Sequence, residues 1–386
     1  MFSLLRNQKV LNTAVQVAFA AGLLLLISLF VVEVRHNLEK QGIRLDPGFL
    51  ERSTGWDINF ALIEYTPGSA YWVAILAGII NTLFAGVISL VLASCIGLLI
   101  GVMRVSKRRI SRSIATIYVE TFRNVPLLLQ LFLWYALLRS MPAPRNSTLE
   151  LGAIAFTGRG VFLPSLNVNG RYLLLALGAL ILGLCVSLWP KSEHTSIALG
   201  SRRTGLIPYV VWTIVAGVVM ASVIWGRIPG TDLLDIPRLN GLNYQGGMRL
   251  PPEFLAIIIG ISVYGGAYIA EIFRAGFQAV PTGVIEAGMA SGLSGWQIFS
   301  RLHFPLAVRI VIPSLTNQYI WLIKATTLGI AIGFYDFFMS ISVAIVNTGQ
   351  TIVLIGLLMA GFLALNFTLA QLMNFVNRKV SLKGHG

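Results

Sequence analysis

The chain has 386 residues, of which 56% are hydrophobic and only 11% are charged. Soluble domains carry about 25% charged residues, so this chain has too few charges to cover a surface that faces water, and lipid must cover much of it. The formal net charge of +14 raises the alternative of a nucleic-acid-binding protein, but no basic stripe with interleaved aromatic residues supports it. Two cysteines and four scattered histidines exclude a disulfide framework and a helical zinc site.

Eight apolar runs are long enough to cross a bilayer, which takes about 20 residues per helix. The first run is too long for a signal sequence, and we expect it to remain as a membrane anchor. The runs predict an all-helical membrane protein with eight spans and both termini in the cytoplasm. They lie at residues 10–32, 71–103, 113–138, 172–189, 206–226, 252–275, 306–335 and 351–376.

The distribution of Lys and Arg tests this topology, because basic residues accumulate in short loops on the cytoplasmic side. With the N-terminus inside, more than half of the 29 Lys and Arg residues fall on the inner side, where only Glu193 and Glu286 oppose them. The charges of the outer loops nearly balance. The basic excess is therefore an orientation signal that faces anionic lipid in a multi-pass membrane protein, and not a nucleic-acid-binding patch.

The chain divides into four segments. Residues 1–70 form an N-terminal membrane helix and a periplasmic segment, and residues 71–140 form the first part of a membrane core. Residues 141–250 read as an insertion, with periplasmic loops rich in Gly, Pro and Asn around an accessory hairpin of two helices. Residues 251–386 form the second part of the core and carry a cytoplasmic loop.

The sequence lacks the common motifs of catalysis. A phosphate-binding loop needs a lysine directly after a glycine, and no lysine of this chain follows one. A serine-hydrolase elbow, a His-Glu metal helix and a dinucleotide fingerprint are also missing from the sequence. We therefore expect a protein that is not an enzyme and binds no cofactor, so that any ATP and Mg²⁺ would sit on a partner.

The most informative loop lies between the sixth and seventh runs, at about residues 276–306. Glu286 opens a short helix, where a carboxylate suits the positive end of the helix dipole, and small residues follow it. Such a helix can sit deep in a groove of another protein, which predicts a docking element. The alternative is a compact turn that needs glycine only to reverse the chain. The residues expected to dock are Glu286, Ala287, Gly288, Gly292, Leu293 and Pro305.

This loop resembles the E-A-A…G…L-P coupling loop of ABC-importer permeases. Gly288 and Phe304 depart from the usual Ala and Leu, but they keep the small and apolar character of those positions. Further stretches resemble the polar-amino-acid permeases, so that the resemblance covers about residues 71–140 and 251–376. These stretches are Tyr118–Gln130, Gly266–Arg274, Pro313–Asn317 and Lys324–Leu328.

The resemblance implies a type I ABC-importer permease fold and a function as the transmembrane permease of an importer of L-amino acids, with alternating access driven by a partner. The implied partners are a cytoplasmic ABC ATPase dimer that holds ATP and Mg²⁺, a periplasmic amino-acid-binding protein and a homologous sister permease. The insertion at 141–250 resembles the larger of the two permeases of general L-amino-acid systems. It therefore implies a heterodimer in the inner membrane.

Polar residues in the run 306–335 are candidates for the substrate pathway. The run exceeds one bilayer crossing, so we expect a broken helix whose irregular backbone is protected inside the bundle. Lys324 could meet a substrate carboxylate, or it could bond helix-end carbonyls or extend toward the membrane surface. Asn317 and Trp321 share a helix face, with Thr316 beside them, and could hold a zwitterion or only join helices.

Two E-x-F-R stretches predict structural ion pairs, Glu120–Arg123 and Glu271–Arg274, because residues three apart share a helix face. For the first pair, a substrate site is the alternative. Two rival functions remain. A secondary transporter would show paired carboxylates at mid-membrane, which are scarce here, and a structural subunit without a pathway would need no polar residues in the seventh run.

Overall fold

The computed structural model describes residues 8–40, 47–146, 150–188 and 201–380, and these are mostly helical. The helices are α1 (Gln8–Lys40), α2 (Tyr71–Arg104), α3 (Arg109–Asn124), α4 (Leu127–Arg139), α5 (Gly170–Leu188), α7 (Ser201–Trp225), α8 (Pro252–Ala279), α9 (Thr282–Ala290), α10 (Gly295–Ile298), α11 (Phe304–Lys324), α12 (Phe337–Thr348) and α13 (Thr351–Val380). Irregular turns are η2 (Pro47–Glu51), η3 (Pro144–Asn146) and η5 (Ala325–Ile332), all 3-10 helical, and the π-helical η4 (Phe299–His303).

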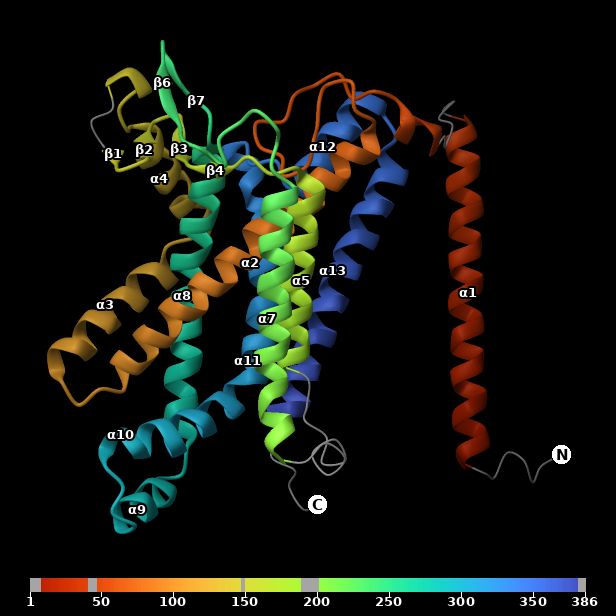
Figure 1. The fold of residues 1–386 in the computed structure, drawn as a ribbon. Coiled ribbons are helices and arrows are strands. Elements are labelled where there is room, and N and C mark those ends of the chain that lie inside the picture. Colours follow the sequence, from red (N-terminus) through yellow and green to blue (C-terminus); the bar gives the residue numbers. More distant parts are fainter. Residues whose placement is uncertain (1–7, 41–46, 147–149, 189–200, 381–386) are drawn as a thin grey trace.

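Short strands gather at one end of the molecule, so the expectation of an all-helical chain is wrong there (Figure 1). Four strands form an antiparallel sheet in the order β1-β2-β3-β8, in which Val161 pairs with Leu250, and two further pairs are β4-β5 and β6-β7. Gly152 and Gly241 turn the chain with φ angles of 63° and 64°, which other residues rarely adopt. The strands are β1 (Glu150–Leu151), β2 (Ile154–Thr157), β3 (Gly160–Leu163), β4 (Ser165–Leu166), β5 (Leu234–Asp235), β6 (Arg238–Asn240), β7 (Asn243–Gln245) and β8 (Met248–Leu250).

Five helical stretches are long and apolar enough to cross a membrane, and a sixth is added if α3 and α4 count as one span. Each of the eight predicted runs coincides with helix, but the predicted count of eight spans is not reached by length and composition in the described residues. The third run is not one straight helix. It bends by 103° between Asn124 and Leu127, because Pro126 has no N–H to continue α3.

The seventh run is irregular, as its length predicts. The α-helix α11 ends at Lys324 and continues as the 3-10 helix η5, which stops at Gly333 with a φ of 80°. A further helix, α12, follows and was not expected from the sequence. Its first turn is capped by Asp336, whose carboxylate accepts hydrogen bonds from the Met339 N–H at 2.8 Å and the Thr326 hydroxyl at 3.4 Å.

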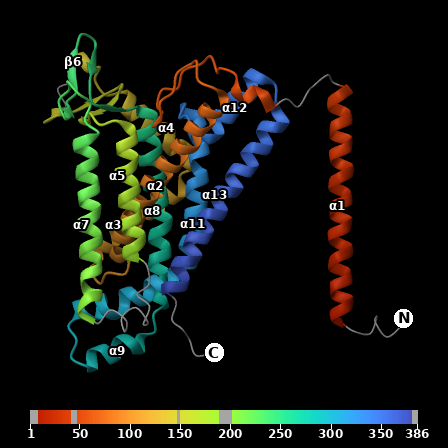
Figure 2. The same ribbon diagram turned by 45° about the vertical axis from the view of Figure 1, so that its right-hand side comes forward.

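Helices α2 and α8 form the centre of the molecule. Their chains run in the same general direction, and the two views show the helices crossing in contact with each other (Figures 1 and 2). Gly97 and Gly101 of α2 face Ile269 and Phe273 of α8 so closely that a Cβ atom at either glycine would lie under 3.0 Å from them. Small residues therefore let the two helices approach each other without intervening side chains. Helices α4 and α11 cover α8 around this contact.

The helices of the insertion and of the N-terminus stand outside this centre. Helices α5 and α7 pack along each other as a hairpin, within the part of their length that the structure describes. Helix α1 lies apart from the rest, and its apolar residues from Val15 to Val32 are exposed in the chain (Figure 2). The start of α1, the end of α13 and helix α9 all lie at the end opposite the strands.

Candidate functional site

The segment between α8 and α11, residues 281–303, forms an elbow at the end of the molecule opposite the strands (Figure 1). It contains α9, α10 and the π turn η4. Helix α10 begins at Ser294, whose side chain and that of Gln297 cap each other's backbone N–H groups. The elbow is therefore a built structure and not an unstructured loop.

Gly292 ends α9 in the left-handed conformation, with a φ of 77°. The Gly292 N–H donates to Met289 O at 2.9 Å and the Leu293 N–H donates to Gly288 O at 3.1 Å, a pattern that closes a helix C-terminus. This position thus needs glycine to reverse the chain, as the compact-turn alternative expects. Helix α9 begins at Thr282 and ends at Ala290, so Glu286 lies in its middle and the expectation that Glu286 opens the helix is wrong.

Gly288 is buried within its own chain. A Cβ atom there would lie 2.9 Å from Leu302 Cδ1 and 3.3 Å from Ile298 Cγ1, so glycine lets α9 lie close against α10 and η4. The departure from the usual alanine at this position therefore has a packing reason. Because Gly288 is buried, it is not an exposed contact residue for a partner.

Other residues of the elbow are exposed. The exposed Ala287 and the half-buried Leu293 border a shallow hollow beside α9, together with Gly283, Gly288 and Leu302. Two large apolar side chains project nearby, since Met289 is 58% exposed and Trp296 is 73% exposed. An exposed apolar surface of this kind, on a part of the chain beyond the long helices, is typical of a protein-binding site.

The elbow is fixed to the long helices by aromatic and proline residues. The His303 ring bonds Phe277 O of α8 at 2.9 Å, and the Phe277 and Phe299 rings stack with centroids 6.0 Å apart. The π turn η4 ends at His303, two residues before Pro305, which has no N–H to donate to a regular helix. Movement of the elbow would therefore be passed to both α8 and α11.

A stripe of α11 carries the candidate pathway residues. Asn317, Trp321 and Lys324 are exposed on one face, and neither the Asn317 nor the Lys324 side chain has a hydrogen-bond partner among the described residues. Thr316 lies beside them, but its hydroxyl donates to Ile312 O at 3.0 Å within the same helix. In the described chain, Lys324 therefore does not bond helix-end carbonyls.

Aromatic rings connect this stripe to α8 and α3. We define the aromatic row as Trp321, Tyr264 and Tyr268: the first two rings are stacked with centroids 5.4 Å apart, and the two tyrosine rings lie 4.9 Å apart. The Tyr264 hydroxyl donates to the Tyr268 hydroxyl at 3.1 Å. At the far end, the Arg123 guanidinium carbon lies 5.0 Å from the centroid of the Tyr268 ring.

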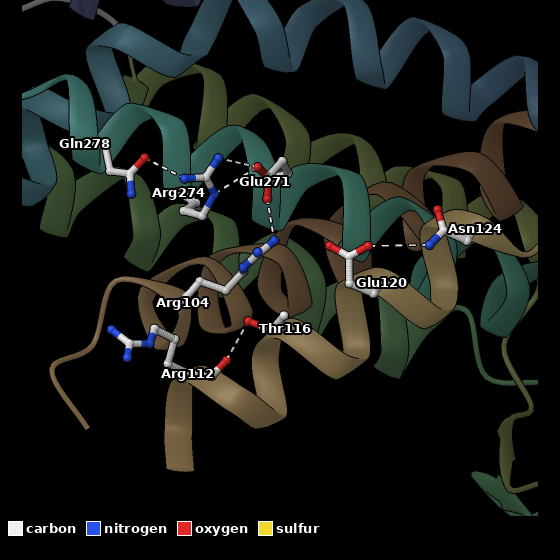
Figure 3. A network of polar contacts seen from close by, with 8 residues as sticks. All are labelled: Arg104, Arg112, Thr116, Glu120, Asn124, Glu271, Arg274 and Gln278. Carbon is white, nitrogen blue, oxygen red and sulfur yellow. Dashed lines mark hydrogen bonds and ion pairs between the residues drawn. The ribbon is translucent and has the colours of Figure 1, made fainter. Parts of the chain in front are cut away.

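A charged network surrounds Glu271 of α8 (Figure 3). Arg104 at the end of α2 donates to Glu271 of α8 at 2.5 Å, and Arg274 donates to the other Glu271 oxygen and to Gln278. The Glu271–Arg274 pair has the spacing that the sequence predicts. The Glu120–Arg123 pair is not formed, because Glu120 instead accepts a hydrogen bond from Asn124 at 3.4 Å and Arg123 lies over Tyr268.

Sequence reasoning missed Tyr264, Tyr268 and Arg104. The two tyrosines lie four apart on α8, a spacing that places them on one face, but only the structure brings Trp321 to them. Arg104 counts as a topology signal in the sequence, and its contact with Glu271 depends on how α2 and α8 cross. In the described part of the chain, no group of three or more His, Cys, Asp or Glu residues could hold a metal ion.

Comparisons with known proteins identify the family. Residues 93–382 match the family of binding-protein-dependent transport system inner membrane components. The chain is 36% identical to the putative amino-acid ABC transporter permease protein YhdX of Escherichia coli (strain K12), over 90% of this chain and 88% of that protein.

Two further relatives match over similar lengths. The chain is 32% identical to the general L-amino acid transport system permease protein AapQ of Rhizobium johnstonii, over 92% of this chain and 89% of that protein. It is 30% identical to the glutamate/glutamine/aspartate/asparagine transport system permease protein BztB of Rhodobacter capsulatus, over 97% of this chain and 93% of that protein. The chain therefore belongs to the family of binding-protein-dependent transport system inner membrane components, as a multi-pass inner-membrane permease and not an enzyme.

Proposed function

We propose that this permease passes L-amino acids along the exposed stripe of α11 and is driven through the elbow by a partner ATPase. The chain is the permease component of an amino-acid ABC importer, as its near full-length similarity to three amino-acid permeases indicates. The relatives' names include general L-amino acid transport and transport of glutamate, glutamine, aspartate and asparagine, which supports a broad range of substrates.

One observation carries the role of the elbow: a hollow and two exposed apolar side chains, Met289 and Trp296, lie on one structured segment that is attached to both α8 and α11. A rigid segment can transmit a displacement, whereas a flexible loop cannot. The cytoplasmic ATPase dimer, which would hold ATP and Mg²⁺, is the partner that this surface suits. Glu286, Ala287 and Leu293 are the proposed contacts, and Gly288, Gly292 and Pro305 give the elbow its shape.

Substitution in the hollow tests this proposal. Ala287→Trp would fill the hollow, and we expect ATPase binding and amino-acid uptake to fall at least tenfold while membrane insertion is unchanged. Thr282→Trp is the matched control, because Thr282 is exposed on the same helix but does not border the hollow. Gly292→Trp is less informative, because the positive φ of Gly292 would strain any larger residue. Normal uptake and ATPase binding by Ala287→Trp would refute docking at the hollow.

The stripe of α11 supports the pathway. Asn317, Trp321 and Lys324 place an amide, an indole and an ammonium group on one exposed face of a membrane helix. Polar groups are costly in a lipid-facing position, so a pathway or a second membrane subunit would cover this face. Lys324→Gln should raise the KM for uptake, whereas Ser314→Ala, an exposed change one turn before the stripe, should not.

The proposed topology has eight spans with both termini in the cytoplasm. Its support is the position of the start of α1, the end of α13 and the elbow at the same end of the molecule (Figure 1). Helices α5 and α7 then form an accessory hairpin, and the strands lie in the periplasm. A periplasmic amino-acid-binding protein would deliver the substrate to that side.

A homologous sister permease is the proposed second half of the pathway, which gives a heterodimer. The chain has one elbow, whereas an ATPase dimer offers two docking sites. Two copies of the strand-bearing insertion would crowd a single periplasmic entrance. Expression with the ATPase but without a sister permease tests this assembly: a stable complex that imports amino acids would show that this chain pairs with itself.

A further inference from the structure

We infer that Arg123 is a binding residue of the transport pathway, which holds the carboxylate of an amino acid at the end of the aromatic row. The inference rests on the proposed function, because it assigns a residue to the substrate of that pathway. It replaces the structural ion pair with Glu120, which the structure does not form.

The surroundings of Arg123 leave its guanidinium without a hydrogen-bond partner among the described residues. The residue is half-buried, and its Nε atom is buried without a hydrogen-bond partner in the described chain. Its guanidinium carbon lies 5.0 Å from the Tyr268 ring centroid, which orients the group but satisfies no N–H. Buried donors are rarely left unpaired, and a carboxylate is the acceptor whose geometry matches two guanidinium N–H groups.

The charges around Arg123 favour an anion. Arg104, Arg123 and Arg274 all act electrostatically on the single Glu271 carboxylate. Both oxygens of that carboxylate are already bonded, one to Arg104 and the other to Arg274. The other acid shown in Figure 3 is Glu120, which is exposed and bonds Asn124. Cationic groups therefore outnumber carboxylates, and the surplus positive charge lies on the one arginine without a carboxylate partner.

The aromatic row supplies the second half of a zwitterion site. Ring faces attract cations, so an ammonium group is stabilised over Tyr264 or the 41% exposed Trp321 while the carboxylate meets Arg123. At the other end of the row, Lys324 follows Trp321 on the same exposed face of α11. The three aromatic rings thus have a cation at each end, Lys324 beside Trp321 and Arg123 over Tyr268.

Equilibrium binding to the whole transporter tests the inference. The permease complex with its ATPase is purified in detergent, and tritiated L-glutamine is competed with unlabelled L-glutamine or with its α-amide, which lacks the carboxylate. We expect Arg123→Gln to weaken L-glutamine binding about tenfold or more and to remove the preference for the free acid over the amide. Arg123→Lys, which keeps the charge, should retain part of that preference.

Arg112→Gln is the matched control, because Arg112 is an exposed arginine on the same helix whose side chain has no hydrogen bond or ion pair among the described residues. It should bind like the wild type. Unchanged affinity and unchanged acid-over-amide preference in Arg123→Gln would overturn the inference. If Arg123→Gln does not assemble, Arg123→Lys and Tyr268→Leu decide, and wild-type preference in both would overturn it. A wild-type complex that neither binds nor transports any L-amino acid would instead contradict the proposed function.

Discussion

Arg104 Nη1 of α2 lies 2.5 Å from Glu271 Oε2 of α8, just beyond the point where Gly101 brings the two helices into contact. The other Glu271 oxygen is bonded by Arg274. The side chains of Arg104 and Glu271 are 15% and 26% exposed, so this pair is shielded from much of the solvent. Close packing and a charge-assisted hydrogen bond thus hold the same ends of α2 and α8 together.

Removal of the Glu271 charge should destabilise this helix pair. Glu271→Gln leaves Arg104 and Arg274 without their carboxylate, and hydrogen bonds between charged groups each contribute about 1.5–3 kcal/mol. We expect a lower midpoint of thermal unfolding in detergent for the purified protein. Glu120→Gln, the same change at an exposed acid with a single 3.4 Å contact, should leave the midpoint unchanged. Equal midpoints for the two variants would show that the Glu271 pairs contribute little.

A methyl group at Gly101 should separate α2 from α8. Its Cβ would lie 2.7 Å from Phe273 Cβ and 3.0 Å from Ala270 O, and neither atom can move without the backbone. Overpacking of this kind costs about 1–3 kcal/mol, more than the gain in helix propensity from glycine to alanine. We expect Gly101→Ala to lower the yield of folded protein in size-exclusion chromatography.

The control for Gly101 is Gly356→Ala in α13, where no atom lies within 4 Å of the added Cβ. This variant should be as stable as the wild type or slightly more stable. If both alanine variants behave alike, the α2–α8 contact tolerates an extra methyl group and the close-packing argument is wrong.

Gly292→Ala should impair coupling without unfolding the membrane core. An alanine in the left-handed region costs about 1–2 kcal/mol, and this cost falls on the C-terminus of α9. We expect reduced ATP-dependent uptake at a normal amount of protein in the membrane. Gly295→Ala, at the first residue of α10 with open space around the new Cβ and outside the hollow, should transport normally. Full uptake by Gly292→Ala would mean that the elbow does not depend on this turn.

The eight-span topology predicts which residues a membrane-impermeant thiol reagent reaches from outside the cell. In a background with Cys95 and Cys185 replaced by serine, Asn240→Cys between β6 and β7 should be labelled, and Ala290→Cys at the end of α9 should be protected. Both residues are exposed in the chain, so only the membrane distinguishes them. Labelling of Ala290→Cys in intact cells would place the elbow on the outer side and remove the proposed orientation.

Apolar run length predicted where helix forms, because a bilayer demands such runs whatever the fold. All eight runs are helical in the structure, and the irregular end of the seventh run follows from its excess length. The short strands were missed because they are two to four residues long, which is too short for a periodic pattern of apolar residues to stand out. Their pairing, such as that of Val161 with Leu250, joins residues on either side of the inserted hairpin.

The candidate site was predicted in part. Motif resemblance located the elbow and the stripe of α11, and the structure shows what each glycine does there. Both predicted ion pairs lie three residues apart on a single helix. The spacing predicted Glu271–Arg274 correctly but failed for Glu120–Arg123. The difference lies in neighbours from other helices, because Tyr268 of α8 provides Arg123 with a ring face that the α3 sequence alone does not reveal.

The helix that begins after Gly292 continues through α10, η4, α11 and η5 as a stretch of 38 residues, Gly295–Ile332. At 1.5 Å per residue its length is about 57 Å, well beyond the ~30 Å of bilayer hydrocarbon. It must therefore extend past the lipid, and the end that does so carries the exposed Trp296. Because Trp296 and Lys324 lie on this one stretch, a tilt of the helix at Trp296 would also displace Lys324.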